Sequence, residues 1–129
     1  MKRVYKPLEP LTSYREALDI LKTGDEDELI RLAVRAGMYL ENWREAQDIC
    51  IRLLENDNPR IRRNAVMGLS YVAVNFGKLD KRIVKPYLLR ELRENAEFRE
   101  DIQMYIDDIN WCMRWKIGEK PIVSVKSKN

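Results

Sequence analysis

The 129-residue sequence contains no histidine. Histidine is the side chain that most often serves as a general base near neutral pH, and it is the commonest metal ligand. Its absence argues against most hydrolase mechanisms and most zinc sites. The five glycines are isolated from one another, so the sequence offers no glycine-rich loop for a phosphate group. We therefore expect no catalytic residues, no metal and no cofactor.

Cysteines and long apolar runs are also scarce. Cys50 and Cys112 are the only two cysteines, and their separation fits no metal-binding spacing. Both lie among apolar residues, which favours free thiols in a reducing cytoplasm over a disulfide. The basic N-terminus is not followed by the apolar run of a signal peptide, and no stretch of about 18 apolar residues is present to span a membrane. The sequence thus predicts a cytoplasmic protein that does not enter the membrane.

The residues that are abundant suit a single globular domain. Apolar residues make up 45% of the chain and charged residues 35%, with 24 Lys and Arg against 21 Asp and Glu. This apolar content is ordinary for a folded protein, and the length matches one domain. A net charge of +3 is mild, so composition alone does not indicate a nucleic-acid partner.

Polar residues mark where helices are expected to begin. Ser, Asp and Asn side chains accept hydrogen bonds from the unpaired N–H groups of a first helical turn. Between these positions apolar residues recur at intervals of three and four, as a helix face requires. Pro86 falls inside the fifth segment, where it either kinks the helix or marks its start. The predicted starts are Ser13, Asp25, Asn42, Asn58, Asp80 and Asn95, and the predicted stops are Gly24, Gly77 and Gly118.

A weak internal repeat relates these segments. A shift of 32 residues aligns Asp25 with Asp57 and Leu29 with Ile61, and a shift of 37 aligns Ile61 with Phe98. Units of this size, each a helix pair, build α-solenoids. We predict an all-α fold, a short α-solenoid of about six helices in antiparallel pairs. Gly37 either ends the second helix or lets a neighbouring helix pack closely.

Residues 53–73 resemble the first helix of a HEAT repeat, with an Asp and a Pro in the turn, then an Arg and a face of small residues. Residues 79–92 resemble the paired second helix, and 98–109 the first helix of the next repeat. The chain also resembles a group of small bacterial HEAT-like proteins. That group often has a His where this chain has Ser70 or Tyr71, so any role of that His is not carried over. The matching positions are Arg62, Asn64, Ala65, Gly68 and Leu69, then Gly77, Lys78, Leu79 and Asp80, then Asp107, Asp108 and Ile109.

The resemblance covers about residues 42–115 and implies a HEAT-like α-solenoid. It further implies an adaptor, or an immunity protein that neutralises a toxin from a neighbouring bacterium. We predict one domain over residues 1–116 and an irregular tail over 117–129. Ile122, Val123 and Val125 would allow that tail to dock as an extended arm.

The sixth predicted helix carries the strongest candidate for a binding surface. Its members are spaced three, four, three and four residues apart and so share one stripe of the helix. Exposed Trp and Met beside carboxylates are typical of protein-binding patches. Alternatively, the two Trp residues pack against the tail or the fifth helix and leave a solvated acidic edge. The stripe consists of Asp101, Met104, Asp108, Trp111 and Trp115.

Basic residues on the fourth and fifth helices give a second candidate surface. Arg and Lys within 58–76 and 80–95 would contact a phosphate backbone without sequence specificity. Glutamates interrupt this field, and Arg62 would alternatively bond Asp57 or a carboxylate of a neighbouring helix. A groove between the third and fifth helices would have mixed charge, which suits a protein better than DNA. Its basic members are Arg52, Lys85, Arg90 and Arg93, which we add to the predicted partner contacts.

Three functional hypotheses follow. The leading one is a non-catalytic protein-binding module, of the immunity or adaptor type, that occludes a partner's surface; a toxin domain encoded nearby is a candidate partner. An immunity protein against a nuclease would usually be acidic, and a net charge of +3 weakens that version. The second is a nucleic-acid-binding HEAT-like protein, and the third a structural subunit or a designed repeat protein. The sequence does not set the oligomeric state.

Overall fold

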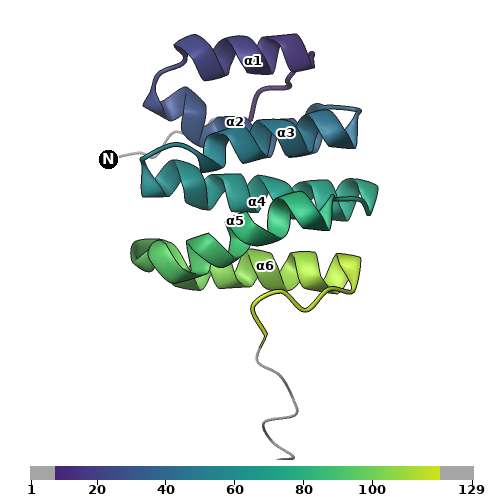
Figure 1. Ribbon diagram of the computed structural model, residues 1–129. Coiled ribbons are helices and arrows are strands. Elements are labelled where there is room, and N and C mark those ends of the chain that lie inside the picture. Colours follow the sequence, from purple (N-terminus) through teal and green to yellow (C-terminus); the bar gives the residue numbers. More distant parts are fainter. Residues whose placement is uncertain (1–7, 120–129) are drawn as a thin grey trace, which may run out of the picture.

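The computed structural model describes residues 8–119, which form six α-helices and one short 3₁₀ helix (Figure 1). This confirms the predicted all-α fold with its six helices. Pro86 lies inside α5 rather than at its start. The elements are α1 (Tyr14–Thr23), α2 (Glu26–Tyr39), α3 (Trp43–Leu54), α4 (Pro59–Phe76), α5 (Lys81–Glu94), η1 (Ala96–Phe98) and α6 (Arg99–Met113).

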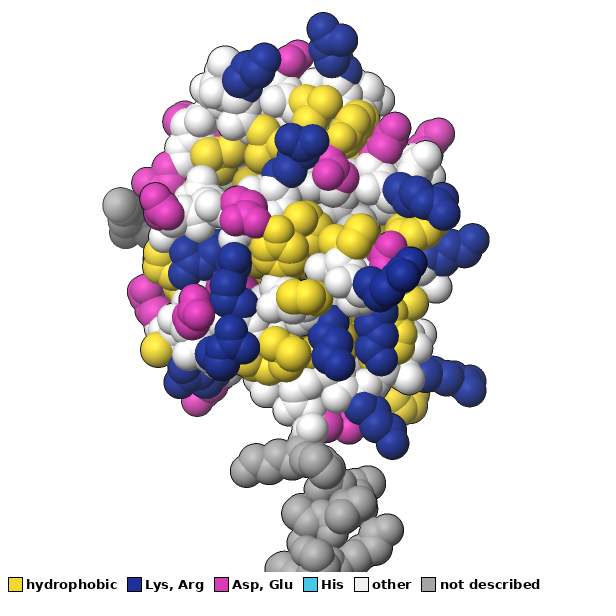
Figure 2. Space-filling model, in the orientation of Figure 1, with side chains coloured by type: hydrophobic (Ala, Val, Ile, Leu, Met, Phe, Trp, Pro, Cys, Tyr) yellow, Lys and Arg dark blue, Asp and Glu magenta, His cyan; other side chains and the backbone are white. Residues whose placement is uncertain are grey.

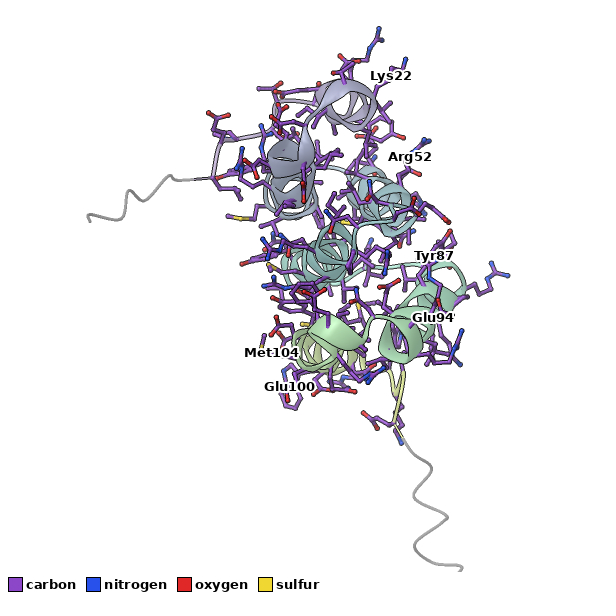
Figure 3. The ribbon with its side chains drawn as sticks, turned by 90° about the vertical axis from the view of Figure 1, so that its left-hand side faces the viewer. Lys22, Arg52, Tyr87, Glu94, Glu100 and Met104 are labelled. Carbon is purple, nitrogen blue, oxygen red and sulfur yellow. The ribbon has the colours of Figure 1, made fainter. Side chains whose placement is uncertain are left out.

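The helices stack in two layers, which are seen nearly end-on in Figure 3. One layer contains α2, α4 and α6, and the other contains α1, α3 and α5. The closest packing joins α2 to α4, and α4 also packs on α3 and α6. As a result α4 lies at the centre of the stack, as its apolar sequence predicts. The arrangement is solenoid-like, with successive helices antiparallel.

Local capping explains where most helices begin. Ser13, Asp25, Asn42, Asn58 and Asp80 each accept a hydrogen bond from a first-turn N–H group, as predicted. The sixth predicted cap is wrong. Asn95 ends α5, and α6 begins at Arg99 after the 3₁₀ turn. The Asn95 side chain is held elsewhere, because its buried amide donates to Pro59 O of α4 and to Glu91 Oε1 of α5, both at 3.0 Å.

The helix ends follow the prediction less closely. Gly77 closes α4 in the left-handed conformation, with a φ of 63°. Gly24 closes α1 in an extended conformation instead. The prediction that α6 stops at Gly118 is wrong, since the helix already ends at Arg114, whose φ of 59° is rare for a residue with a Cβ.

After α6 the chain folds back under the stack. Asn110 holds the returning backbone at both groups of Ile117, donating to its carbonyl at 2.9 Å and accepting from its N–H at 3.0 Å. Ile117 is 2% exposed, so it belongs to the core rather than to the predicted tail. The other predicted arm residues, Ile122, Val123 and Val125, lie outside the described residues.

Cys50 is buried and Cys112 half-buried, and both are free thiols. Burial raises the pKa of the Cys50 thiol well above its ordinary range. Among residues 8–119, none of the helices is both long enough and apolar enough to traverse a bilayer.

Two glycines allow α2 and α4 to approach at backbone distance. A Cβ added to Gly68 would lie 2.6 Å from the carbonyl oxygen of Ala33, and one added to Gly37 would lie 2.7 Å from that of Gly68. Gly37 is buried within α2, so of the two predicted roles it has the close-packing one. Two amides of α4 strengthen this contact, because Asn64 donates to Ile30 O and Asn75 to Gly37 O.

A buried carboxylate joins α5 to the rest of the stack. Glu91 is 1% exposed and accepts hydrogen bonds from Arg62 at 3.1 Å and from Arg90 at 3.1 and 3.2 Å. The same two guanidinium groups donate to the backbone of the α3–α4 connection, at Leu54, Asn56 and Asp57. Glu91 is therefore the centre of a polar network linking α4, α5 and the turn between α3 and α4.

The glycine contact predicts a stability effect. Gly68→Ala should lower the free energy of unfolding by about 1–3 kcal/mol, because the new methyl group meets backbone atoms that cannot rotate away. Gly77→Asn is the matched control. It has open space around it, and Asn tolerates the left-handed conformation, so the change should stay within about 0.5 kcal/mol. Urea unfolding followed by circular dichroism measures both, and equal losses would contradict the close approach.

The buried carboxylate predicts a second effect. Glu91→Gln should cost about 3 kcal/mol, because two guanidinium groups lose their charged partner away from bulk water. Glu94→Gln, three residues along the same helix with its side chain 62% exposed, should change stability by less than about 0.5 kcal/mol. Thermal and urea unfolding of the two variants provide the comparison. A Glu91→Gln variant as stable as the wild type would show that the network contributes nothing.

Candidate protein-binding face

Exposed apolar side chains gather on the layer formed by α2, α4 and α6. Six large apolar residues of the described chain are exposed, and five of them belong to this layer. Trp111 is the most exposed at 85%, far beyond what core packing would leave. The sixth, Ile83, lies on α5. We call the set of five the Trp111 face: Met38, Tyr71, Val74, Met104 and Trp111.

The helix register makes this face continuous. Gly37 lies against the Cβ of Tyr71, so its neighbour Met38 lies at the crossing of α2 and α4. Val74 and Trp111 line one groove between α4 and α6. Figure 3 shows Met104 on the side of the stack opposite Arg52 and Tyr87. The apolar residues therefore run from α2 across α4 to α6 on a single side of the molecule.

The groove has a volume of about 910 Å³ and lies between the C-terminal ends of α4 and α6. Ala73, Val74 and Cys112 contribute apolar surface, and Trp111 and Trp115 border it. The left-handed turn at Arg114 directs the chain back toward α5. There the Lys81 ammonium lies 5.6 Å from the centre of the Trp115 ring, within the range of a cation–π contact.

Of the five residues predicted to form one stripe on the sixth helix, three are exposed together and two are not. Met104, Asp108 and Trp111 are exposed together on α6, as expected. Asp101 is only partly exposed and forms an ion pair with Arg63 of α4, at 3.2 Å. Trp115 lies beyond the end of α6 and is half-buried beside α5, so the packing alternative holds for Trp115 and not for Trp111.

Three members of the face were not predicted as binding residues: Met38, Tyr71 and Val74. The sequence carries a signal for two of them, because α4 is apolar nearly all round from Ala65 onward. That pattern indicates a central helix, and α4 is central. It does not distinguish a helix covered on all sides from one whose fourth side is open.

The opposite face of the stack carries mixed charge, as predicted for the groove between α3 and α5 (Figure 2). Its four predicted basic contacts do not converge on one place. Arg52 pairs with Asp48 at 2.8 Å, and Arg90 is held by Leu54 O and Glu91. Lys85 and Arg93 are exposed, and Arg93 reaches Glu94 only at 3.9 Å. Half of the predicted set therefore already has intramolecular partners.

The basic residues that open α4 are also engaged. Arg62 donates to Asp57 O at 2.8 Å and to buried Glu91, which confirms both intramolecular partners expected from the sequence. Arg63 pairs with Asp101, and its guanidinium lies 5.1 Å from the centre of the Phe98 ring. Of these three arginines, only Arg60 has no such contact among the described residues. The start of α4 does not present an open row of cations.

Two tyrosine–carboxylate pairs join neighbouring helices within the layer of α1, α3 and α5. The Tyr14 hydroxyl donates to Asp48, and the Tyr87 hydroxyl donates to Glu55. Each hydrogen bond raises the pKa of its tyrosine above the ordinary value of 10.0, and partial burial adds to the effect. The pairs fasten α1 to α3 and α3 to α5.

These pairs predict how stability depends on pH. Because the pKa of each tyrosine is higher in the folded state, the stabilisation is complete below about pH 10 and is lost as pH rises through the folded-state values. In the Tyr14→Phe/Tyr87→Phe variant, stability should fall less steeply above about pH 10 than in the wild type. Tyr71→Phe, which loses no hydrogen bond to a described residue, should keep the wild-type slope. Urea unfolding at several alkaline pH values tests this, and identical slopes in all three proteins would contradict it.

Acidic side chains are candidates for metal ligands or for a catalytic pair. Within 8–119, no group of three or more Cys, Asp or Glu side chains is placed to hold a metal ion. Asp107 and Asp108 are both exposed, and Asp107 accepts a hydrogen bond from Gln103 at 2.9 Å.

No family model, curated protein or solved structure matches this chain. The resemblance to small HEAT-like proteins accordingly remains a prediction, and any function must be argued from the faces themselves.

Proposed function

We propose that the protein is a non-catalytic binding module whose partner, another protein, docks on the Trp111 face. The observation that carries this proposal is the 85% exposure of Trp111 within a group of exposed apolar side chains. Contiguous exposed apolar surface is uncommon on proteins that act alone, and it often marks an interface. Tryptophan is also the residue most enriched among those that dominate binding energy.

The chemistry of the face favours a protein over nucleic acid. Met38, Val74 and Met104 offer flexible aliphatic surface, which suits apolar side chains of a partner. Asp107 and Asp108 lie beside Trp111 and would repel a phosphate backbone. The alternative expectation, nucleic-acid binding through Arg and Lys of 58–76 and 80–95, has less support because Arg62, Arg63 and Arg90 already contact groups of the protein itself.

On this proposal the protein acts by occlusion. α6 is packed on α4, and α4 is packed on α2 through the glycine contact, so the face is held on ordered helices before any partner arrives. A preformed surface avoids the entropic cost of ordering on binding. An immunity protein or an adaptor of the cytoplasm, with a toxin domain or other protein encoded nearby as partner, is the type of function that fits best.

The test is binding to the products of the genes that flank its own. We expect one of them to form a complex, and Trp111→Ala to weaken that complex by at least about tenfold. The variant should stay folded, because a side chain so exposed contributes little to stability.

Ile83→Ala is the matched control for this experiment. It removes an exposed apolar side chain, 43% accessible, that lines a groove with Trp43 and Ile51 of α3 in the other layer, and it should leave affinity unchanged. Isothermal titration calorimetry of wild type and both variants gives the three dissociation constants. A complex that keeps full affinity with Trp111→Ala would refute the site, and no complex at micromolar concentration with any flanking product would refute a partner encoded nearby.

A further inference from the structure

Positive charge gathers at the end of the stack where α4 and α6 end and α5 begins. The residues come from the α4–α5 turn, the first turns of α5 and the segment after α6, and all are exposed. Figure 2 shows Lys and Arg side chains concentrated at the lower right, where α5 begins and α6 ends. We call this group the cationic rim: Lys78, Lys81, Arg82, Lys85, Arg114 and Lys116.

The cationic rim is not neutralised within the described part of the chain. Arg52, Arg62, Arg63 and Arg90 form ion pairs, whereas none of the six rim residues does so with a described residue. The carboxylate next to it in sequence, Asp80, caps α5 and accepts from the Arg82 N–H group. The excess of positive charge at the rim is local, because the described part of the chain as a whole contains more acidic than basic residues. All 21 Asp and Glu of the chain but only 18 of its 24 Lys and Arg lie in residues 8–119.

The position of the rim opposes the local electrostatics of the helix. The N-terminus of a helix carries partial positive charge, so acidic residues are favoured in its first turn. The first turns of α1, α2, α3 and α6 contain acidic residues, whereas those of α4 and α5 contain none, and α5 begins with Lys81 and Arg82. A bound anion would relieve this repulsion.

Part of the rim borders the apolar groove. Gly77, which precedes Lys78, lines the groove together with Arg114, Trp115 and Lys116. The Lys81 ammonium lies over the ring of Trp115, which borders that groove. A ligand that covered Trp111 and extended toward α5 would therefore pass from apolar surface directly onto cations.

We infer that the partner docks through an acidic segment, with an apolar side chain against Trp111 and its carboxylates along the cationic rim. This inference rests on the proposed function and adds the chemistry of the partner. A polypeptide fits better than single-stranded nucleic acid, because Asp107 and Glu119 also line the groove. A phosphate chain carries charge at every nucleotide, whereas a peptide can place an uncharged residue beside those carboxylates.

The inference is tested with synthetic probes. The first is a fluorescein-labelled peptide in which Asp and Glu residues flank a central Leu-Phe pair, and the second replaces each acid by Lys. The third is labelled oligothymidylate. Fluorescence anisotropy of the full chain should show binding of the acidic peptide only, with affinity falling as salt is raised.

Two charge-reversal variants locate the site. Arg82→Glu/Lys85→Glu changes the rim, and Arg15→Glu/Lys22→Glu makes the same change in net charge on α1, at the other end of the stack (Figure 3). We expect the first to weaken acidic-peptide binding by at least about tenfold and the second by less than about twofold. Thermal unfolding should show both variants folded, and glutamates in the first turns of α5 are favourable there.

Several results would overturn the inference. They are equal losses in the two variants, binding of the Lys peptide as tight as that of the acidic one, tighter binding of oligothymidylate, or no binding of the acidic peptide at millimolar concentration. The outcomes that refute the acidic partner differ from the one that refutes the proposed function. If a flanking gene product still requires Trp111 while the acidic peptide does not bind, only the acidic partner is refuted, and if Trp111→Ala leaves the complex intact, the binding face itself is refuted.

Discussion

Glu91 places a carboxylate at a position that water hardly reaches, and two arginines and one asparagine close around it. The position of α5 depends on this network. α5 packs less closely on α3 and α4 than α2 does on α4, although Val84 and Leu88 of α5 are fully buried. The network compensates, because Arg62 and Arg90 also bind the carbonyl groups that α3 and the following turn leave unpaired. Through α5 the network also sets where Lys81, Arg82 and Lys85 stand relative to the groove.

The layer that carries the Trp111 face is held by a different interaction. α2 and α4 meet through backbone and small side chains at Gly37 and Gly68, and α4 then supports α6. Such a contact leaves few alternative packings, because helices this close cannot rotate without clashing. The two layers are thus held in place by different interactions. Close apolar packing orders the face, and a charged network orders the cationic end next to it.

Sequence reasoning succeeded where structure is decided locally. Five helix starts follow from a single side chain accepting from the next turn, and Trp111 and Met104 share a stripe by helical spacing alone. It failed where distant groups compete. Asn95 has the chemistry of a cap, but its amide donates to Pro59 O of α4 and to Glu91 in the last turn of α5. Helical periodicity likewise did not reveal Tyr71 and Val74, because it identifies apolar positions and not which of them a neighbouring helix covers.

Arg52 and Arg90 show the same limit for charges. Their sequence positions predict a shared groove, yet each is bound by a group of its own chain, and cations without such partners remain elsewhere. Arg114 and Lys116 join those cations only because the chain turns back after α6. In that turn Arg114 adopts the left-handed conformation, and nothing in the sequence predicts it.

We propose that partners bind on the layer of α2, α4 and α6. Hydroxyl-radical footprinting of the complex tests it most directly, because Met and Trp side chains are among the fastest to be oxidised and three of them lie on this face. Met38, Met104 and Trp111 should be oxidised readily in the free protein and be protected in the complex, while Trp43 and Tyr87 of the other layer keep their reactivity. Protection of Trp43 and Tyr87, with Trp111 still oxidised at its free rate, would contradict the claim.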